Sequence, residues 1–344
     1  MNNISVIYQS HKQRYQLSLV ITLMMLSIMA ILALKFGAIN LSWQEVLHND
    51  EISRQVLVEL RLPRVITTII TGISLAVAGV LMQGLFRNPM ADPSLIGMSS
   101  GASLAAMIFI LLSSQQLLPL WLNNIGLSLS AFIGSLLVAL LTYSLSARKG
   151  NSNIGILLLA GIAINALCGS MIGLLTYIAN DDALRSITFW SMGSFANSDY
   201  NSVGFILCAI FISIPILKTT PKFLDSLLIG ESYATILGLN LAREKNKLIF
   251  IIAILVGACT AFVGPIGFVG LIIPHIVRMI IGSSSHKKLL IISSISGALL
   301  LTIADLIART IIVPSEVPIG IITALIGAPY FTYLLYKRRT QIGY

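Results

Sequence analysis

Residues 83–103 read QGLFRNPMADPSLIGMSSGAS, and they interrupt two long apolar runs with two X-Pro steps and two charged side chains. Proline breaks or kinks a helix interior because it lacks the backbone N–H and crowds the preceding turn. The residue before a proline is also pushed away from helical backbone angles. Pro89 and Pro93 therefore predict an irregular turn between two helices. Whether that turn lies in water or in a membrane depends on the runs around it.

The surrounding composition is that of an integral membrane protein. Of 344 residues, 56% are apolar and 10% are charged, and mean hydropathy is +0.91, whereas about a quarter of the residues in a soluble domain are charged. The apolar runs are continuous and do not alternate with polar residues, which favours helices over a β-barrel. A helical span needs roughly 20 apolar residues. The sequence thus predicts an all-α polytopic membrane protein with ten spans, near residues 17–36, 64–84, 94–112, 125–146, 154–178, 202–217, 246–264, 266–282, 289–307 and 318–336.

The first run follows His11, Lys12 and Arg14, as a signal peptide would. It is longer than a typical signal-peptide core and lacks a clear cleavage site, so we interpret it as an uncleaved helix. Ten spans place both termini on one side. If that side is cytoplasmic, it carries 16 of the 22 Lys and Arg residues, as the positive-inside rule expects. The formal charge of +9 is explained by topology and needs no nucleic-acid partner.

Two stretches are long enough to need a purpose outside the membrane: residues 37–63, expected outside, and residues 218–247, expected inside. The inner stretch has an apolar helical face after Pro221, and Gly238 is placed to end a second short helix. Short amphipathic helices between spans lie on the membrane, pack on the bundle or dock a cytosolic partner. The residues alone leave all three uses open.

Basic residues at the outer ends of two spans also have two explanations. Arg61 and Arg64 flank Pro63, and Arg309 closes the ninth span, four residues after Asp305. Snorkelling or a local ion pair would account for them. A surface that meets an acidic partner is the alternative.

Catalytic and metal-binding motifs are absent from the sequence. It has no G-x-x-x-x-G-K-[ST], HExxH or G-x-S-x-G motif. Cys168, Cys208 and Cys259 lack metal-ligand spacing, so we expect them to be small buried hydrophobic residues without a disulfide. We expect His275 to act as a hydrogen-bond donor in helix packing. Few ionisable residues fall inside the spans, where ion-coupled transporters need them. We expect no enzyme activity and no bound metal, and uphill transport would take its energy from another subunit.

Eight motifs in order then carry a family resemblance. They read RLPR (61–64), QGLFRNPMADPSLIGMSSGA (83–102), LLLAGIAI (157–164), ALRSITFWSMGS (183–194), LLIGESYATILGLNL (227–241), GPIGFVGLIIPHIVR (264–278), ADLIAR (304–309) and EVPIGIITALIGAPYF (316–331). From about residue 60 to residue 337 the chain resembles the FecCD-type permeases, the membrane subunits of ABC importers for ferric siderophores, haem and cobalamin.

The resemblance implies the type II ABC importer permease fold, with a single transmembrane domain over residues 1–344. It implies a homodimer with the translocation path along its axis, a cytoplasmic ABC ATPase dimer and a periplasmic substrate-binding protein. ATP and Mg would be bound by the ATPase, and no cofactor by this chain. The location implied is the inner membrane, with both termini cytoplasmic.

Matched positions imply roles for individual residues. Arg61, Arg64 and Arg309 would meet acidic residues of the binding protein, which would favour encounter rate and register. Residues 227–239, within the cytoplasmic stretch 218–247, would be the coupling helices that enter a groove on the ATPase. The contact residues there are Leu228, Gly230, Glu231, Ser232, Tyr233, Leu237 and Gly238.

The turn within residues 83–103 would be a cytoplasmic gate, with Asn88, Pro89 and Met90 near the axis. A second gate would come from Asn153 and Ile154, where GNSNIGI departs from the Thr/Ser character of the family. The path would be lined by the fifth span, by the segment after it and by parts of other spans. The path residues expected are Asn165, Ser170, Trp190 and Met192. Small residues in the fifth span would equally suit a helix-packing seam.

The function expected is import of an iron chelate. NDDALRSITFWSMGS (180–194) resembles haem permeases, so haem is favoured over a ferric siderophore, with cobalamin third. The rivals from other classes are a secondary transporter or channel that works alone, and an intramembrane enzyme. The first would act without ATP, and the second would need a paired nucleophile and base or a metal-ligand set.

Overall fold

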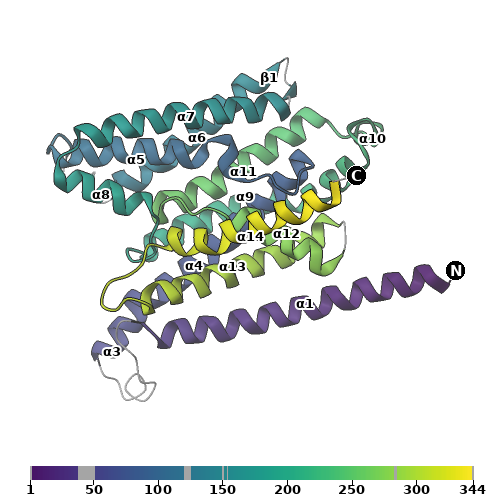
Figure 1. Cartoon of the computed structure of the whole chain (residues 1–344), viewed down its shortest axis with the longest axis horizontal. Coiled ribbons are helices and arrows are strands. Elements are labelled where there is room, and N and C mark those ends of the chain that lie inside the picture. Colours follow the sequence, from purple (N-terminus) through teal and green to yellow (C-terminus); the bar gives the residue numbers. More distant parts are fainter. Residues whose placement is uncertain are drawn as a thin grey trace.

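The computed structural model describes residues 2–37, 51–119, 125–148, 151–152, 154–282 and 285–342. The long helices run along a common direction, with α1 at one edge of the bundle and α5, α6 and α7 at the opposite edge (Figure 1). The elements in chain order are α1 (Asn2–Lys35), α3 (Glu51–Gln55), the π-helix η1 (Val56–Arg61), α4 (Leu62–Phe86), the 3₁₀ turn η2 (Pro93–Ile96), α5 (Met98–Ser114), α6 (Gly126–Ser146), β1 (Ala147–Arg148), β2 (Asn151–Ser152), α7 (Ile154–Ile178), α8 (Asp181–Ser191), α9 (Tyr200–Ile229), α10 (Glu231–Ile236), α11 (Leu241–Val263), α12 (Val269–Ile281), α13 (His286–Thr310) and α14 (Ile319–Ile342).

The all-helical membrane architecture confirms the predicted fold class. Within the described residues, seven helices are long and apolar enough to cross a membrane, and three shorter apolar helices accompany them. Together they coincide with the ten predicted spans. β1 and β2 form a two-residue antiparallel pair, Ala147 with Ser152 and Arg148 with Asn151, at the turn between α6 and α7.

Two boundaries differ from the prediction. We expected a helix to stop at residue 217, but α9 continues through Pro215 and Pro221 to Ile229. Each proline costs one backbone hydrogen bond, and the turns beyond are held because Phe223, Leu224 and Leu227 are buried in the core.

The second difference lies at the other end of the bundle. Residues 51–86 run as one continuous helix through α3, η1 and α4, so much of the expected outer loop is helical. The hydroxyl of Tyr200 donates to the carbonyl of Val58 in η1, at 2.7 Å. This hydrogen bond gives one backbone carbonyl of the π-helix a partner from α9. Residues 38–50 of that loop lie outside the described residues.

The centre of the bundle is built on α4 and α11, whereas α1 and α7 are mostly exposed. A Cβ on Gly72 would lie 2.3 Å from the carbonyl oxygen of Gly297, and one on Gly79 would lie 2.0 Å from that of Gly270. α4 therefore touches α13 and α12 backbone to backbone. Such contacts let helices associate in lipid, where no hydrophobic effect drives them together.

Candidate functional site

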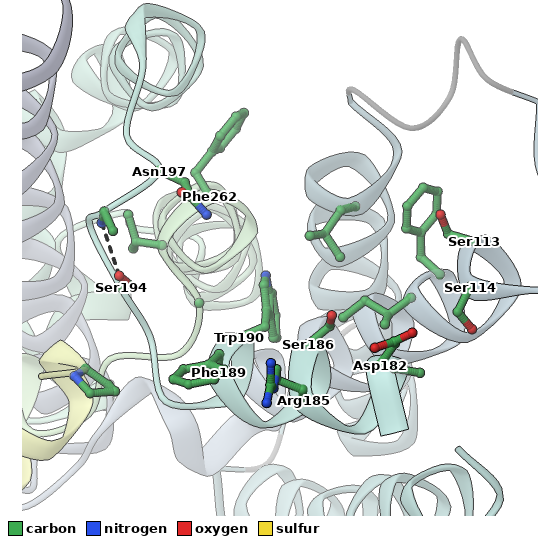
Figure 2. A pocket seen from close by; sticks show the side chains of 18 of the residues that line it. Ser113, Ser114, Asp182, Arg185, Ser186, Phe189, Trp190, Ser194, Asn197 and Phe262 are labelled. Atoms are coloured by element: carbon green, nitrogen blue, oxygen red, sulfur yellow. Dashed lines mark hydrogen bonds between the residues drawn. The ribbon is translucent and has the colours of Figure 1, made fainter. Parts of the chain in front are cut away.

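A cavity of about 760 Å³ opens between α5, α6, α8 and α11, at the end of the molecule that carries α8 (Figures 1 and 2). One face of α8 forms a wall, because its lining residues recur at helical spacing. These residues are Asp182, Arg185, Ser186, Phe189 and Trp190, with Ala183 at the buried margin of the same face. Opposite them lie Phe109, Ser113, Ser114, Asn197, Phe262, Glu316 and Pro318. The cavity thus combines aromatic walls with one guanidinium and a few polar groups.

The other face of α8 holds the helix in place. Asn180 caps its start, accepting a hydrogen bond from the backbone N–H of Ala183 at 2.9 Å. Ala183 and Ile187 are buried in a small cluster with Met107 and Leu111 of α5. The chain therefore fixes α8 by its buried face and leaves the polar and aromatic face to the cavity.

Three backbone segments meet below the cavity. The N–H of Ser194 donates to the carbonyl of Val263 at 2.9 Å, and the N–H of Gly320 donates to the carbonyl of Met192 at 3.0 Å. A Cβ on Gly264 would lie 2.5 Å from the carbonyl oxygen of Trp190, and one on Gly320 would lie 2.3 Å from that of Met192. Glycine is needed at both positions so that α8, α11 and α14 can join there.

The four predicted path residues separate into two groups. Trp190 lines the cavity, and Met192 follows at the end of α8, exposed and hydrogen bonded through its backbone. Asn165 instead donates to the carbonyl of Ser94 at 3.1 Å and accepts from the hydroxyl of Ser100. Asn165 thus ties α7 to the chain around η2. Ser170 is exposed and donates to Ala166 of its own helix at 3.0 Å.

Asp182, Arg185 and Glu316 line the cavity but were not chosen from the sequence. A signal was present, because the i, i+3, i+4, i+7, i+8 spacing along α8 groups Asp182 and Arg185 with Trp190. Glu316 gave no such signal, since it reaches the site only through the chain reversal before α14.

The chain after α4 makes the irregular turn that its prolines predicted. The side chain of Asn88 accepts from the N–H of Met90 at 2.9 Å, an Asx turn that stands in for a backbone bond. Pro89 and Met90 border a narrow crevice with α12 and α14. The other residues of that crevice are Leu271, Ile272, His275, Tyr330, Phe331 and Leu334. The proposed gate role stays a prediction. Ile154 is the half-buried first residue of α7, and Asn153 lies outside the described residues.

Asp92 lies at the end of the same turn. Its carboxylate caps η2 by accepting from the N–H of Ser94 at 2.9 Å. Burial raises the pKa of Asp92 above its usual value, and the hydrogen bonds to Ser94 oppose that shift. The carboxyl group borders a cavity of about 150 Å³ that reaches Pro265 and Gly267, between α11 and α12. The non-helical segment after α4 and the non-helical segment between α11 and α12 therefore border the same cavity inside the bundle.

The three outer arginines have partners inside the chain. Arg61 is 6% exposed, and its guanidinium donates to the carbonyls of Leu34 at 2.7 Å and Lys35 at 2.6 Å. Arg309 is 4% exposed and donates to the carbonyl of Ala33. Both groups therefore satisfy carbonyls of the last turn of α1, which have no partner within the helix.

Arg64 forms the strongest ion pair of this region. It binds Asp305 through two nitrogens, the shorter contact being 2.8 Å, and Glu316 at 2.8 Å. The local pair considered from the sequence, Asp305 with Arg309, is longer at 3.5 Å. All three arginines are thus engaged by groups of this chain, and docking of a binding protein by them stays a prediction.

The predicted coupling segment is a bend at the opposite end of the molecule, the end that carries the beginning of α1 and the end of α14 (Figure 1). Gly230, with φ of 149°, interrupts the helix between α9 and α10. Gly238, with φ of 79°, follows the end of α10 as expected. Ser232 is exposed, and several apolar side chains of the bend are also exposed. These are Leu228, Ile229, Tyr233, Ile236 and Leu237. Ala234 is fully buried and anchors α10 to the bundle.

Glu231 points in a different direction from those apolar residues. Its carboxylate lies 3.1 Å from the ammonium of Lys245 and 3.4 Å from the guanidinium of Arg87. The sequence suggested Glu231 as part of an ATPase contact, but here its partners belong to this chain.

Comparison with known proteins places this geometry in a family. The FecCD transport family matches residues 25–337. The chain is 41% identical over 323 residues to the hemin transport system permease protein HmuU of Yersinia pestis, covering 93% of this chain and 95% of that one. It is 37% identical to the cobalamin import system permease protein BtuC of Halobacterium salinarum, covering 85% of this chain and 76% of that one.

A solved structure agrees with the sequence relatives. The chain is similar to a metal-chelate type ABC transporter in an inward-facing conformation, with a TM-score of 0.82, 34% identity, and coverage of 93% of this chain and 98% of that one. The match therefore extends over nearly the whole chain. The chain belongs to the FecCD transport family.

Proposed function

We propose that this chain is the permease subunit of an ABC importer that moves an iron chelate across the inner membrane, from periplasm to cytoplasm. The observation that carries the proposal is the cavity on the face of α8, in a bundle of apolar helices similar to permeases of this kind. A chain of this kind contributes a path and docking surfaces, while ATP hydrolysis belongs to a separate subunit.

Haem is the substrate that we favour over a ferric siderophore. Haem offers a flat aromatic ring and carboxylates, and the cavity offers Phe189, Trp190 and Phe262 beside Arg185. Guanidinium groups bind carboxylates through paired hydrogen bonds and stack on aromatic faces. The higher identity to a hemin permease than to a cobalamin permease supports the same choice.

Cobalamin is the second candidate, and one observation favours it. Relatives named as cobalamin import permeases match the chain at 37% and 38% identity over more than four fifths of its length. A cavity volume of about 760 Å³ does not by itself separate the two substrates.

The orientation follows from charge and from the placement of the termini. The beginning of α1, the end of α14 and α10 share one end of the molecule, and α3 and α8 share the other (Figure 1). The first end would be cytoplasmic by the positive-inside rule. The ATPase dimer would dock on the exposed apolar residues of the α9–α10 bend, and the binding protein at the end near Arg61, Arg64 and Arg309.

A second copy of the chain would complete the path. α7 is largely exposed, and a Cβ on Gly169 or Gly173 would meet nothing within 4 Å. Small residues on an apolar helix surface permit close approach of another helix in lipid. We therefore propose a homodimer in which α7 faces the twofold axis.

Uptake into proteoliposomes tests the function. The permease, its ATPase and its binding protein would be reconstituted together, and haem, ferric siderophores and cobalamin offered in turn with ATP or with a non-hydrolysable analogue. We expect ATP-dependent uptake of haem. Uptake of cobalamin alone would select the second candidate, and uptake without ATP or without the ATPase would indicate a transporter that works alone.

A further inference from the structure

Charged side chains from three separate elements meet beside α10. Glu231 begins α10, Arg87 ends α4, and Lys245 belongs to the first turns of α11. One carboxylate oxygen of Glu231 is 3.1 Å from Nζ of Lys245 and 3.4 Å from Nη2 of Arg87. A single carboxylate therefore joins the proposed ATPase-docking segment to the turn that follows α4.

The two contacts of Glu231 differ in burial. The side chain of Lys245 is 3% exposed, and a buried ammonium group without a partner is strongly unfavourable. Glu231 is thus held toward the bundle. The side chain of Arg87 is 43% exposed, so its pair with Glu231 is weaker and is screened by salt. The buried contact keeps the Glu231 carboxylate directed toward Arg87, and the exposed contact is the one whose loss the chain can tolerate.

The backbone at Arg87 points to a role for its side chain. Arg87 has φ of 48° and ψ of 32°, the left-handed conformation that ends α4. Glycine or asparagine is usual where a helix ends this way, and arginine has no backbone advantage there. The ion pair with Glu231 accounts for an arginine at this position.

A second link holds the same bend to the same helix end. Oδ1 of Asp225, in the last turns of α9, lies 2.6 Å from Nδ1 of His286 and accepts from its backbone N–H at 2.9 Å. The imidazole is fully buried. Its Nε2 would lie 3.1 Å from a Cβ on Gly84, so the ring rests on the last turn of α4, three residues before Arg87.

We propose that Glu231 and Arg87 are positioning residues that transmit movement of α10 to the turn at residues 87–97. This inference rests on the proposed function, because it needs an ATPase that moves α10. Displacement of α10 pulls on Arg87 through Glu231, and the turn carries that displacement to Pro89 and Met90 at the crevice with α12 and α14. Glu231 thereby acts within the chain, and the exposed apolar residues of the bend remain for the ATPase.

The first test needs no substrate. Hydrogen exchange of residues 87–97 would be compared between the purified wild-type chain and the variant Arg87→Gln, with Arg87→Lys as the conservative variant. Arg87→Gln leaves the buried Lys245–Glu231 pair intact, so the chain should fold. We expect exchange in the turn to rise roughly two- to fivefold, the effect of losing one exposed ion pair, and Arg87→Lys to restore part of the protection.

The matched control is Arg243→Gln, since Arg243 is, like Arg87, an exposed arginine at the end of a helix. That variant should exchange like the wild-type chain. Equal exchange of residues 87–97 in the wild-type and Arg87→Gln chains would overturn the link. Because this experiment uses the permease alone, its result does not depend on whether the proposed substrate is right.

The second test uses the reconstituted importer. Arg87→Gln should keep ATPase copurification and basal hydrolysis but lower the substrate moved per ATP at least threefold. Arg87→Lys, which keeps a positive charge beside Glu231, should restore part of that ratio. A wild-type ratio of transport to hydrolysis in Arg87→Gln would refute the transmission role even if the exchange result held. Failure of the wild-type importer to transport at all would count against the proposed function instead.

Discussion

Arg61 and Arg309 show how much a side chain's role depends on what packs beside it. Both were expected at the outer surface, and both instead donate to carbonyls at the end of α1. α1 has little other burial, since Ala33 is its buried apolar residue among those whose side chains are described. The two arginines therefore attach the last turn of a helix that has few buried side chains of its own.

Replacement of Arg61 by alanine should loosen α1. Two charge-assisted hydrogen bonds from a 6% exposed group would be lost, and hydrogen bonds to charged groups contribute about 1.5–3 kcal/mol each. We expect a lower melting temperature in detergent and faster proteolysis after residue 37. Arg54→Ala, at an exposed position of α3, is the control and should melt like the wild-type chain. Equal stability of the two variants would contradict the attachment role.

Asp305 is the residue on which the neighbouring network depends. It is 2% exposed and receives both Arg64 and Arg309. Removal of one member of a buried pair leaves an uncompensated charge, whereas replacement of both members by apolar residues is often tolerated. Because Arg64 and Arg309 share this one carboxylate, replacement of either arginine would also affect the other. Sequence spacing alone does not show that the two residues depend on each other.

At the scale of elements, the two faces of α8 have different roles. Its buried face packs on α5, and its other face lines the cavity, with Arg185 between Phe189 and Asp182 (Figure 2). The turn beyond it is joined to α11 and α14 by backbone hydrogen bonds. These contacts hold the wall of the cavity in a fixed position, as a translocation path requires if it is not to close around its substrate.

Arg185→Gln should lower uptake without affecting the fold. The side chain is exposed to the cavity, so stability should change little, while a carboxylate-bearing chelate would lose its paired donor. We expect uptake to fall about tenfold, the effect of about 1.4 kcal/mol, in the reconstituted importer. Arg54→Gln, at the same end of the bundle but outside the cavity lining, should transport normally. Full activity of Arg185→Gln would exclude this residue from the path.

Glycine pairs decide how closely α4 packs on its neighbours. A Cβ on Gly79 would lie 2.0 Å from a backbone oxygen of α12, where no flexible side chain can move aside. Gly79→Val should therefore prevent native packing, with poor expression and aggregation in detergent, because overpacking of this severity exceeds the usual cost of about 1–3 kcal/mol. Gly204→Val, at a position of α9 with nothing within 4 Å, is the matched control and should express normally. A stable monodisperse Gly79→Val chain would contradict the backbone contact.

At the scale of the whole molecule, the exposed surface is unevenly distributed. α4 and α11 are enclosed by other helices, whereas α7 is exposed along most of its length. Gly169 and Gly173 of α7 face open space, and an apolar helix surface of this kind is suited to close contact with a helix of a second copy of the chain. The proposed dimer would place α7 and its partner on either side of the axis.

Gly173→Leu tests that arrangement. A Cβ at this position would meet nothing within 4 Å in this chain, so the fold should be retained, whereas a leucine side chain would block close approach of a second α7. We expect a shift from dimer to monomer, measured by light scattering after size-exclusion chromatography in mild detergent. Gly204→Leu on α9 should leave the mass unchanged. A dimeric Gly173→Leu protein would rule out a glycine-mediated α7 contact.

The sequence by itself determined the class of the molecule and the order of its helices. Continuous apolar runs specify membrane helices because lipid cannot satisfy an exposed backbone, and Pro89, Pro93 and Gly238 mark turns because their backbone preferences are local. The helix at residues 154–178 was therefore predicted at its observed bounds. The Gly-rich and aromatic motifs were sufficient to predict the family.

Only the tertiary structure decided which charges meet. Arg64 and Asp305 are 241 residues apart, and Arg87 and Glu231 are 144 apart, so no spacing rule pairs them. Helix packing selects these partners, because the depth and rotation of each helix depend on contacts such as Gly72 with Gly297. The same packing buries Lys245 and Arg61 and leaves Arg87 exposed. Hydropathy is a property of each segment, whereas the burial of a charge is a property of the segments that surround it.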